Sequence, residues 1–167
     1  MKKVLIITLL AVVAWCAGTA VVAAQATDTK IVTVNATVAA TAKLTLSSLV
    51  VNFPDADPDL TPSITVAPIT VDAKAKTGAA QHVTLTVLAD QDLTSGGNTI
   101  AITNITWIVS GGGLIAGTMD RVTAQPLGDW VGSGNHSGNT QTYSLANSWA
   151  YATGAYVAHV TYTLTAP

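Results

Sequence analysis

The sequence contains no glutamate, one arginine (Arg121) and one cysteine (Cys16), and charged residues make up only 10% of its 167 residues. Because Cys16 has no second cysteine to pair with, no disulfide forms within the chain, and the fold must be held by packing and sheet hydrogen bonds. Strong helix formers other than alanine are scarce, whereas threonine and valine are abundant. This composition favours strands over helices.

The scarcity of charge also limits the kinds of partner. Without residues 1–26, five basic residues remain against nine aspartates, which gives a net charge of −4. Such a chain offers no basic groove, so nucleic-acid binding is excluded. We expect an outer surface of Thr, Asn, Ser and Ala side chains, and such neutral, flat faces tend to meet other proteins or glycans.

The first 26 residues have the pattern of a Sec signal peptide. Lys2 and Lys3 precede the run Val4–Val13, which is apolar except for Thr8, and Ala24-Gln25-Ala26 fits a cleavage site. The sequence therefore predicts a mature chain that begins at Thr27, is secreted or held at the cell surface, and has no membrane span once the signal is removed. A signal that is retained as a membrane anchor is the alternative.

The mature chain begins with a long alternating stretch, Ile31–Leu46. Its even positions are all apolar, and its odd positions are more polar, with four threonines, Asn35 and Lys43 among them. This period of two is typical of a strand with one buried face. The stretch is much longer than the usual strand of about five or six residues. We therefore assign residues 27–46 to a long N-terminal strand, a possible donor segment, and residues 47–167 to the domain proper.

The rest of the chain reads as short strands separated by turn residues. The expected strands are Leu49–Phe53, Ser63–Val66, Ile69–Lys76, His82–Ala89, Thr99–Ile102, Ile105–Val109, Met119–Gln125, Gln141–Leu145 and Ala155–Ala166. Glycine-rich loops are expected at 110–117 and 128–138. The pattern predicts an all-β fold, a single immunoglobulin-like Greek-key sandwich of about eight to ten strands. An open barrel is the alternative.

The end of the chain resembles WxL surface domains, which close with a strand that carries Trp-x-Leu shortly before a proline. Tyr162-Thr163-Leu164 stands in that position here, and Val83-Thr84-Leu85 is nearest to the family's mid-chain Trp-x-Leu. The resemblance covers Val71–Pro167 and implies a secreted sandwich at the cell surface. Both tryptophans are replaced, so the cell-wall binding that goes with them does not carry over.

Both ends of the mature chain also resemble those of chaperone–usher fibre subunits. In that family an alternating N-terminal extension inserts as a strand into the neighbouring subunit, and the last strand borders the acceptor groove. The resemblance implies a donor within Thr29–Ala40 and an acceptor edge at Tyr156–Leu164, although the cysteine pair common in classical pilins is absent. The candidate assembly residues are Val32, Val34, Ala36, Val38, Tyr156, Val160, Tyr162 and Leu164.

One loop has the residue types of a cation site. Asp55, Asp57 and Asp59 alternate in a proline-rich loop, as ligands do at the start of a calcium loop. Leu60 and Val66 stand where an EF-hand needs glycine and glutamate, and aspartates in turns commonly bond their own backbone. We weigh calcium against an ordinary solvated turn, and we expect no other cofactor.

The tryptophans of the mature chain receive different interpretations. Trp107 shares a face with Ile105 and Val109 and is expected in the core. Trp130 lies in the predicted 128–138 loop and is the candidate platform for a sugar ring, with folding back over the sandwich as the alternative. Trp149 and Tyr151, just before Gly154 and Tyr156, are expected to build a corner in which a tyrosine hydroxyl caps backbone groups.

We expect no enzyme. His82, His136 and His159 lie far apart in the sequence, and the run around His136 lacks the spacing of a nucleophile elbow. The leading hypothesis is a non-enzymatic surface protein that self-associates or joins a larger surface assembly by strand addition. A carbohydrate or cell-wall binding module is the alternative.

Overall fold

The computed structural model describes residues 28–167 of the chain. Contacts divide the chain into a unit of residues 1–36 and a unit of residues 37–167. The strands of the described residues all belong to the second unit. The predicted signal peptide, residues 1–26, lies outside the described residues.

The second unit is all-β. Its elements in chain order are β1 (Thr41–Leu46), β2 (Ser63–Thr65), β3 (Ile69–Lys76), β4 (His82–Ala89), β5 (Leu93–Ser95), β6 (Asn98–Ile100), the 3-10 turn η1 (Ile102–Asn104), β7 (Ile105–Ser110), β8 (Gly117–Thr118), β9 (Gln125–Val131), β10 (Gly134–Ala146) and β11 (Val160–Thr165). The all-β prediction is confirmed, and the bounds of β3 and β4 are those expected from the alternation.

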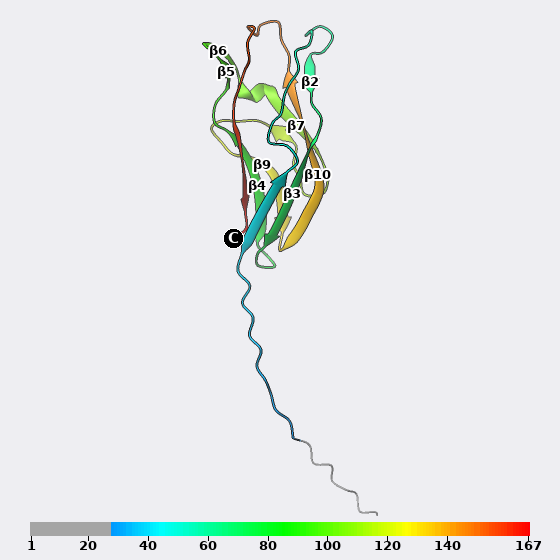
Figure 1. Cartoon of the computed structure of the whole chain (residues 1–167), viewed down its shortest axis with the longest axis vertical. Helices are drawn as coiled ribbons and strands as arrows, with labels where there is room; N and C mark the ends of the chain where they lie inside the picture. Colours follow the sequence, from blue (N-terminus) through cyan, green and yellow to red (C-terminus); the bar gives the residue numbers. More distant parts are fainter. Residues whose placement is uncertain (1–27) are drawn as a thin grey trace, which may run out of the picture. The chain divides into compact units, whose positions relative to one another are not determined.

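The strands form two main antiparallel sheets. One has the order β1-β3-β10-β7-β8 with β2 also paired to β10, the other has the order β11-β4-β9, and β5 and β6 make a small hairpin. Figure 1 shows β3 and β10 in one layer and β4 and β9 in the other. The long central strand β10 bonds to three neighbours, so it sets the register of the first sheet.

The core lies between the two layers because alternate side chains of each strand point inward. In β4, Val83, Leu85 and Val87 are completely buried. Trp107 of β7 is also buried, as predicted, and its ring meets Tyr143 of β10 edge to face. The residues of the two sheets form one hydrophobic cluster. A single core between two sheets is the arrangement of a β-sandwich.

The strand predicted over Ile31–Leu46 forms only in part. Residues 28–40 belong to no strand, and the ladder with β3 begins at Thr41. Alternation shows which face of a segment would be buried, but a strand also needs a partner to accept its backbone hydrogen bonds. Of the described chain, only residues 41–46 of this stretch have such a partner.

Three other expectations are corrected by the structure. Leu49–Phe53 forms no strand, because Ser48 Oγ binds the Val50 backbone and holds a turn there. The expected strand Met119–Gln125 reduces to β8 just before it and the start of β9. The stretch 128–138 is not a loop: it is the end of β9 and the start of β10, joined at a turn where Gly132 has a φ of 75°.

Candidate assembly site

Residues 28–40 form an extended apolar ribbon that the sandwich does not use. None of them belongs to a strand, and every side chain among them is exposed. Val34, at the centre, is 87% exposed, and Val32 and Val38 are similarly open to solvent. Three valines on one face of a segment are normally covered, because burial of each valine contributes about 1.5–3 kcal/mol. This ribbon contains the segment Thr29–Ala40 that the sequence predicts as a donor, and it has no strand partner in the described chain.

Most edges of the sandwich are protected against pairing with another chain. Strand β8 has two residues, and β2, β5 and β6 have three each. Strand β9 carries Pro126 and a bulge, and the 113–115 loop bonds to its outer side through Ile115 and Asp129. Strand β1 carries the exposed Lys43. Short length, proline, bulges and lysine are the usual devices that keep edges from aggregating.

Strand β11 lacks these devices. It pairs with β4 on one side, and the described chain supplies no strand on its other side. Its sequence, Val-Thr-Tyr-Thr-Leu-Thr, has no charge and no proline. An uncharged edge of six residues in regular pairing is a template for a further strand. Of the acceptor edge expected over Tyr156–Leu164, the part from Val160 onward is a regular strand, and its pairing with a donor stays a prediction.

The inner face of β11 is only half covered. Val160, Tyr162 and Leu164 lie opposite Ala89, Val87 and Leu85 of β4, which are buried. The three β11 side chains themselves are half-buried, as is Tyr156 upstream. Strand β1, the edge of the other sheet, approaches β11, and its Leu44 and Leu46 are half-buried too. The core thus thins along the side where β1 and β11 meet.

A tyrosine pair fixes β11 to the opposite layer. Tyr162 donates a hydrogen bond of 2.7 Å to Oε1 of Gln141, and Tyr143 donates one of 2.6 Å to the Tyr162 oxygen. Burial raises the pKa of both hydroxyls, and the neighbouring Tyr143 raises that of Tyr162 further. Both hydroxyls therefore stay protonated and act as neutral donors. The buried Gln141 and the tyrosine bridge gave no signal in the sequence, because the partners are distant in the chain.

A tyrosine hydroxyl caps the backbone near the end of the chain, as predicted, but it belongs to Tyr156, and Trp149 and Tyr151 do not supply it. The Tyr156 hydroxyl donates a hydrogen bond of 2.8 Å to the carbonyl of Ala152. This bond closes the bend that leads into β11 and so positions the free edge. Trp149, upstream of it, is 70% exposed.

Trp130 does not offer a sugar platform. It lies in β9, not in a loop, and is only 7% exposed. Its Nε1 donates to the carbonyl of Gly112 at 3.0 Å, and its ring stacks on His136 with centroids 4.7 Å apart. Both neighbouring glycines are needed for this packing, because a Cβ on Gly113 or Gly128 would collide with the indole. The prediction of an exposed stacking face at Trp130 is wrong; the ring folds back to cover the sandwich, as the alternative had it.

The loop with Asp55, Asp57 and Asp59 is a turn built on its own backbone. Asp57 Oδ1 accepts the amide of Asp59 at 2.9 Å, and the Asp57 carbonyl accepts the amide of Thr61. Asp59 Oδ1 accepts the indole hydrogen of Trp149 at 3.1 Å. Among residues 28–167, no three His, Cys, Asp or Glu side chains are grouped so that they could hold a metal ion. Two of the three carboxylates thus have a structural role, and calcium binding stays a prediction.

The three histidines are not brought together. His82 pairs with Asp129 at 2.7 Å, His159 with Asp90 at 3.0 Å, and His136 packs on Trp130. The backbone amide of His159 bonds to Asp90 and, with its ring, lowers the pKa of that carboxyl. His159 is exposed, as expected. These pairs connect neighbouring strands and loops at the surface.

No helix in the described part of the chain is long and apolar enough to cross a membrane. Comparisons with protein-family models, with curated proteins and with solved structures find no match for this chain. The likenesses to WxL domains and to chaperone–usher subunits therefore remain resemblances of particular residues.

Proposed function

We propose that the protein is a non-enzymatic structural subunit, secreted through the Sec pathway, that assembles at the cell surface by strand addition. The residue 28–40 ribbon of one copy pairs with the free edge of β11 in the next. The observation that carries the proposal is the coexistence of an unpaired, alternating apolar ribbon and an uncharged, unprotected sheet edge in one chain.

The ribbon fits the β11 edge in the pattern of its side chains. Its apolar row, Val32, Val34, Ala36 and Val38, provides a face that matches the half-covered inner face of β11. The opposite row is more polar, because it holds Thr33, Asn35 and Thr37 between Ile31 and Ala39, and threonine suits the solvent side of a sheet. Main-chain hydrogen bonds supply the affinity, and the alternating valines fix the register, since a shift by one residue would turn them to water.

The second candidate, a glycan-binding module, rested on Trp130 as its platform. Burial of that ring removes the residue that motivated it. Strand addition is therefore the function that the geometry supports best.

The test compares two full-length variants that place the same charge on opposite faces of the ribbon. Val34→Asp puts a carboxylate on the apolar row, and Thr33→Asp puts it on the threonine row. Neither residue is buried in the described chain, so both variants should fold like the wild type. Light scattering after size exclusion and electron microscopy report assembly.

We expect Val34→Asp to abolish assembly and Thr33→Asp to retain it, because only the first buries an unpaired charge on pairing. Thr163→Lys, on the outer face of β11, should also weaken assembly by protecting the edge. A wild type that is monomeric at all concentrations, or equal assembly of both ribbon variants, would refute strand addition.

A further inference from the structure

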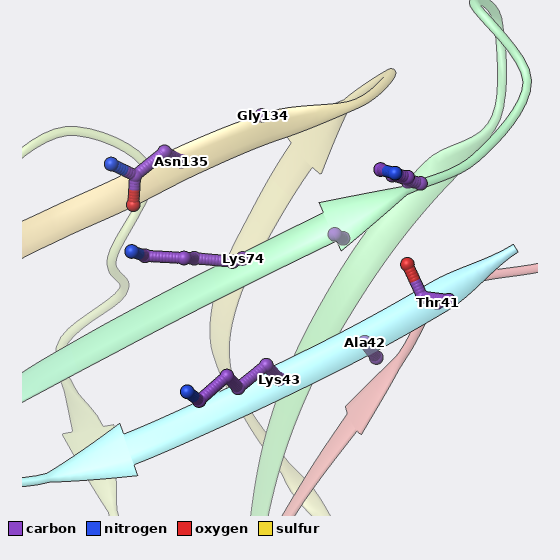
Figure 2. Close-up of a pocket in the computed structure, with 8 residues that line it drawn as sticks. Thr41, Ala42, Lys43, Lys74, Gly134 and Asn135 are labelled. Atoms are coloured by element: carbon purple, nitrogen blue, oxygen red, sulfur yellow. The ribbon is translucent and has the colours of Figure 1, made fainter.

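Three of the few basic residues gather on one outward face of the first sheet. Lys43 of β1 stands directly opposite Lys74 of β3, Lys76 lies two residues further along β3, and Thr41 is opposite it. Figure 2 shows Lys43 and Lys74 extended side by side with their ammonium groups directed to the same side, beside Asn135 of β10. A hollow of about 250 Å³ lies among these residues. We call Lys43, Lys74 and Lys76 the basic face.

This arrangement is unfavourable within a single molecule. Like charges directly opposite in a sheet repel each other. None of the three lysines forms a salt bridge within residues 28–167, whereas Lys30 and Arg121 are paired with Asp28 and Asp92. The carboxylate on the same face, Asp72, accepts the amide of Gly138 at 2.7 Å. Water and salt screen this repulsion in part, and an anionic partner that covers the face would offset it further.

Six of the nine aspartates lie at the opposite end of the sandwich, whereas Asp129 lies near the basic face, where it pairs with His82. Strand β10 begins beside the basic face, where Asn135 pairs with Lys74. It ends beside the 54–62 loop, where Asn147 donates to the carbonyls of Ala56 and Thr61. At about 3.3 Å per residue, its 13 residues span roughly 40 Å. Asp90, Asp92 and Asp120 lie at the same end as the loop, because they follow or bond to the end of β4.

This acidic end also has the features of a contact surface. Trp149 and Leu60 are exposed there, beside the three aspartates of the loop. Trp149 is held by its hydrogen bond to Asp59. An exposed tryptophan in a fixed position is the kind of residue that dominates interfaces between proteins. The negative charge of the loop complements the lysines of the basic face. The exposed Trp149 and Leu60 beside the loop complement the hollow in that face.

We propose that copies of the chain stack head to tail, with the acidic 54–62 loop of one copy on the basic face of the next. This inference rests on the proposed strand addition and assigns it a direction. The ribbon enters β1 at Thr41, next to Lys76, so it leaves its own sandwich at the basic end. Strand β11 runs from the acidic end to the basic end, since Val160 pairs with Ala89 and Thr165 with Thr84.

The direction of pairing decides which ends meet. If the donor ribbon pairs antiparallel to β11, its C-terminal end lies at the acidic end of the neighbour. The sandwich that follows the ribbon then places its own basic face at that end. A parallel donor would emerge at the neighbour's basic end, and the two sets of lysines would meet. Charge complementarity therefore selects antiparallel addition and one polarity along the assembly.

Zero-length cross-linking of wild-type assemblies tests the contact directly. A carbodiimide joins an amine and a carboxylate only where the two touch, and mixing isotope-labelled with unlabelled protein identifies links between copies. We expect links from Lys43, Lys74 or Lys76 to Asp55, Asp57 or Asp59. Assemblies in which these lysines give no such link would overturn the head-to-tail contact while strand addition still stands.

Charge reversal gives an independent readout. At low salt, Lys74→Glu with Lys76→Glu should slow assembly about tenfold, because steering between the two ends is lost. Added salt should slow wild-type assembly and reduce the difference in assembly rate between the wild type and this variant, because salt screens exposed charges. Copies that carry Asp55→Lys and Asp59→Lys should restore the assembly rate when they are mixed with the Lys74→Glu, Lys76→Glu variant, because the reversed charges again attract each other. As the control, Lys74→Arg with Lys76→Arg keeps the positive charge and should assemble like the wild type.

The remaining outcomes also decide the question. If the lysine variants assemble normally but lose retention on an acidic polysaccharide or on anionic vesicles, the basic face binds that polyanion and the head-to-tail contact is wrong. If the wild type forms no assembly, the contact falls together with strand addition. If Val34→Asp blocks assembly but the charge-reversal variants assemble at the wild-type rate, strand addition stands and only the head-to-tail direction is wrong.

Discussion

The hydroxyl of Tyr162 donates its hydrogen to Oε1 of Gln141 at 2.7 Å, and this bond ties the last strand of one sheet to the central strand of the other. Gln141 is completely buried, and its Nε2 has no partner within the described residues. Strand β11 therefore keeps its position although its outer edge is unpaired. A free edge serves as an acceptor only if it is held in a regular extended form, and the tyrosine bridge supplies that support.

Removal of this hydroxyl should destabilise the sandwich. Tyr162→Phe leaves the buried Gln141 oxygen without its donor, which costs about 1–3 kcal/mol in free energy of unfolding. Tyr156→Phe is the matched control, since its hydroxyl bonds an exposed carbonyl and its loss should cost about 0.5–1.5 kcal/mol. Urea unfolding followed by tryptophan fluorescence measures both. Equal effects of the two substitutions would show that the bridge has no special weight.

The same pair predicts loss of stability in alkali. Burial raises the pKa of Tyr143 and of Tyr162 above the ordinary value of 10.0. The folded state then binds protons that the unfolded state releases, so stability is fully present below pH 10 and falls as the pH rises above it. Tyr162→Phe should flatten this fall, as measured by urea unfolding at increasing pH. A wild type whose stability does not change through that range would contradict the prediction.

The sequence predicted those strands whose alternation and partners are both regular. Strands β3 and β4 match because each has a neighbour on both sides, so pattern and pairing agree. The stretch Ile31–Leu46 has the same pattern, yet its first part lacks a partner in the described chain. The predicted strand and its covered face therefore exist only in β1, where Leu44 and Leu46 are half-buried, and residues 31–40 are exposed on both faces. The opposition of Lys43 and Lys74 depends on the β1–β3 register, which no local pattern contains.

Trp130 shows how composition misled the assignment of residues 128–138. Glycines there favour a loop locally. Gly128 instead lies in strand β9. The position requires glycine because the Trp130 ring occupies the space where a Cβ would be. The glycine thus serves packing and not flexibility, which is a relation between side chains that a one-dimensional reading does not detect.

This explanation predicts a steric penalty at Gly128. Gly128→Ala places a methyl group against the Trp130 indole, and such overpacking costs about 1–3 kcal/mol in free energy of unfolding. Gly97→Ala is the control, because nothing lies within 4 Å of its Cβ position and its φ is not positive. That change should be neutral or stabilise by up to about 1 kcal/mol. Chemical denaturation of both variants provides the comparison, and equal stabilities would refute the packing role.

A comparison of two tryptophans tests the burial of Trp130. Trp130→Ala should lower the free energy of unfolding by about 3–5 kcal/mol, because a large buried ring is removed. Trp149→Ala should leave the stability of the single copy within about 0.5 kcal/mol, because that ring is exposed. In assembly, by contrast, Trp149→Ala should have the larger direct effect, because the head-to-tail contact assigns a role to Trp149. A small effect at position 130 would contradict its place in the core.

Addition of the donor as a separate peptide should restore what Val34→Asp removes. A synthetic peptide of residues 29–40 can occupy the β11 edge of this variant, whose own ribbon is impaired, and binding to the folded state alone stabilises it in proportion to the logarithm of peptide concentration. We expect the thermal midpoint to rise with peptide concentration while the protein stays monomeric, because the peptide carries no sandwich of its own. A control peptide of the same composition exchanges Val32 with Thr33, Val34 with Asn35 and Val38 with Thr37, which moves the three valines to the opposite face of the strand. We expect this control peptide to bind less tightly, because its valines face away from the half-covered side of β11. A fully scrambled peptide should not bind at all. A midpoint that does not respond to the native peptide would show that β11 is not an acceptor.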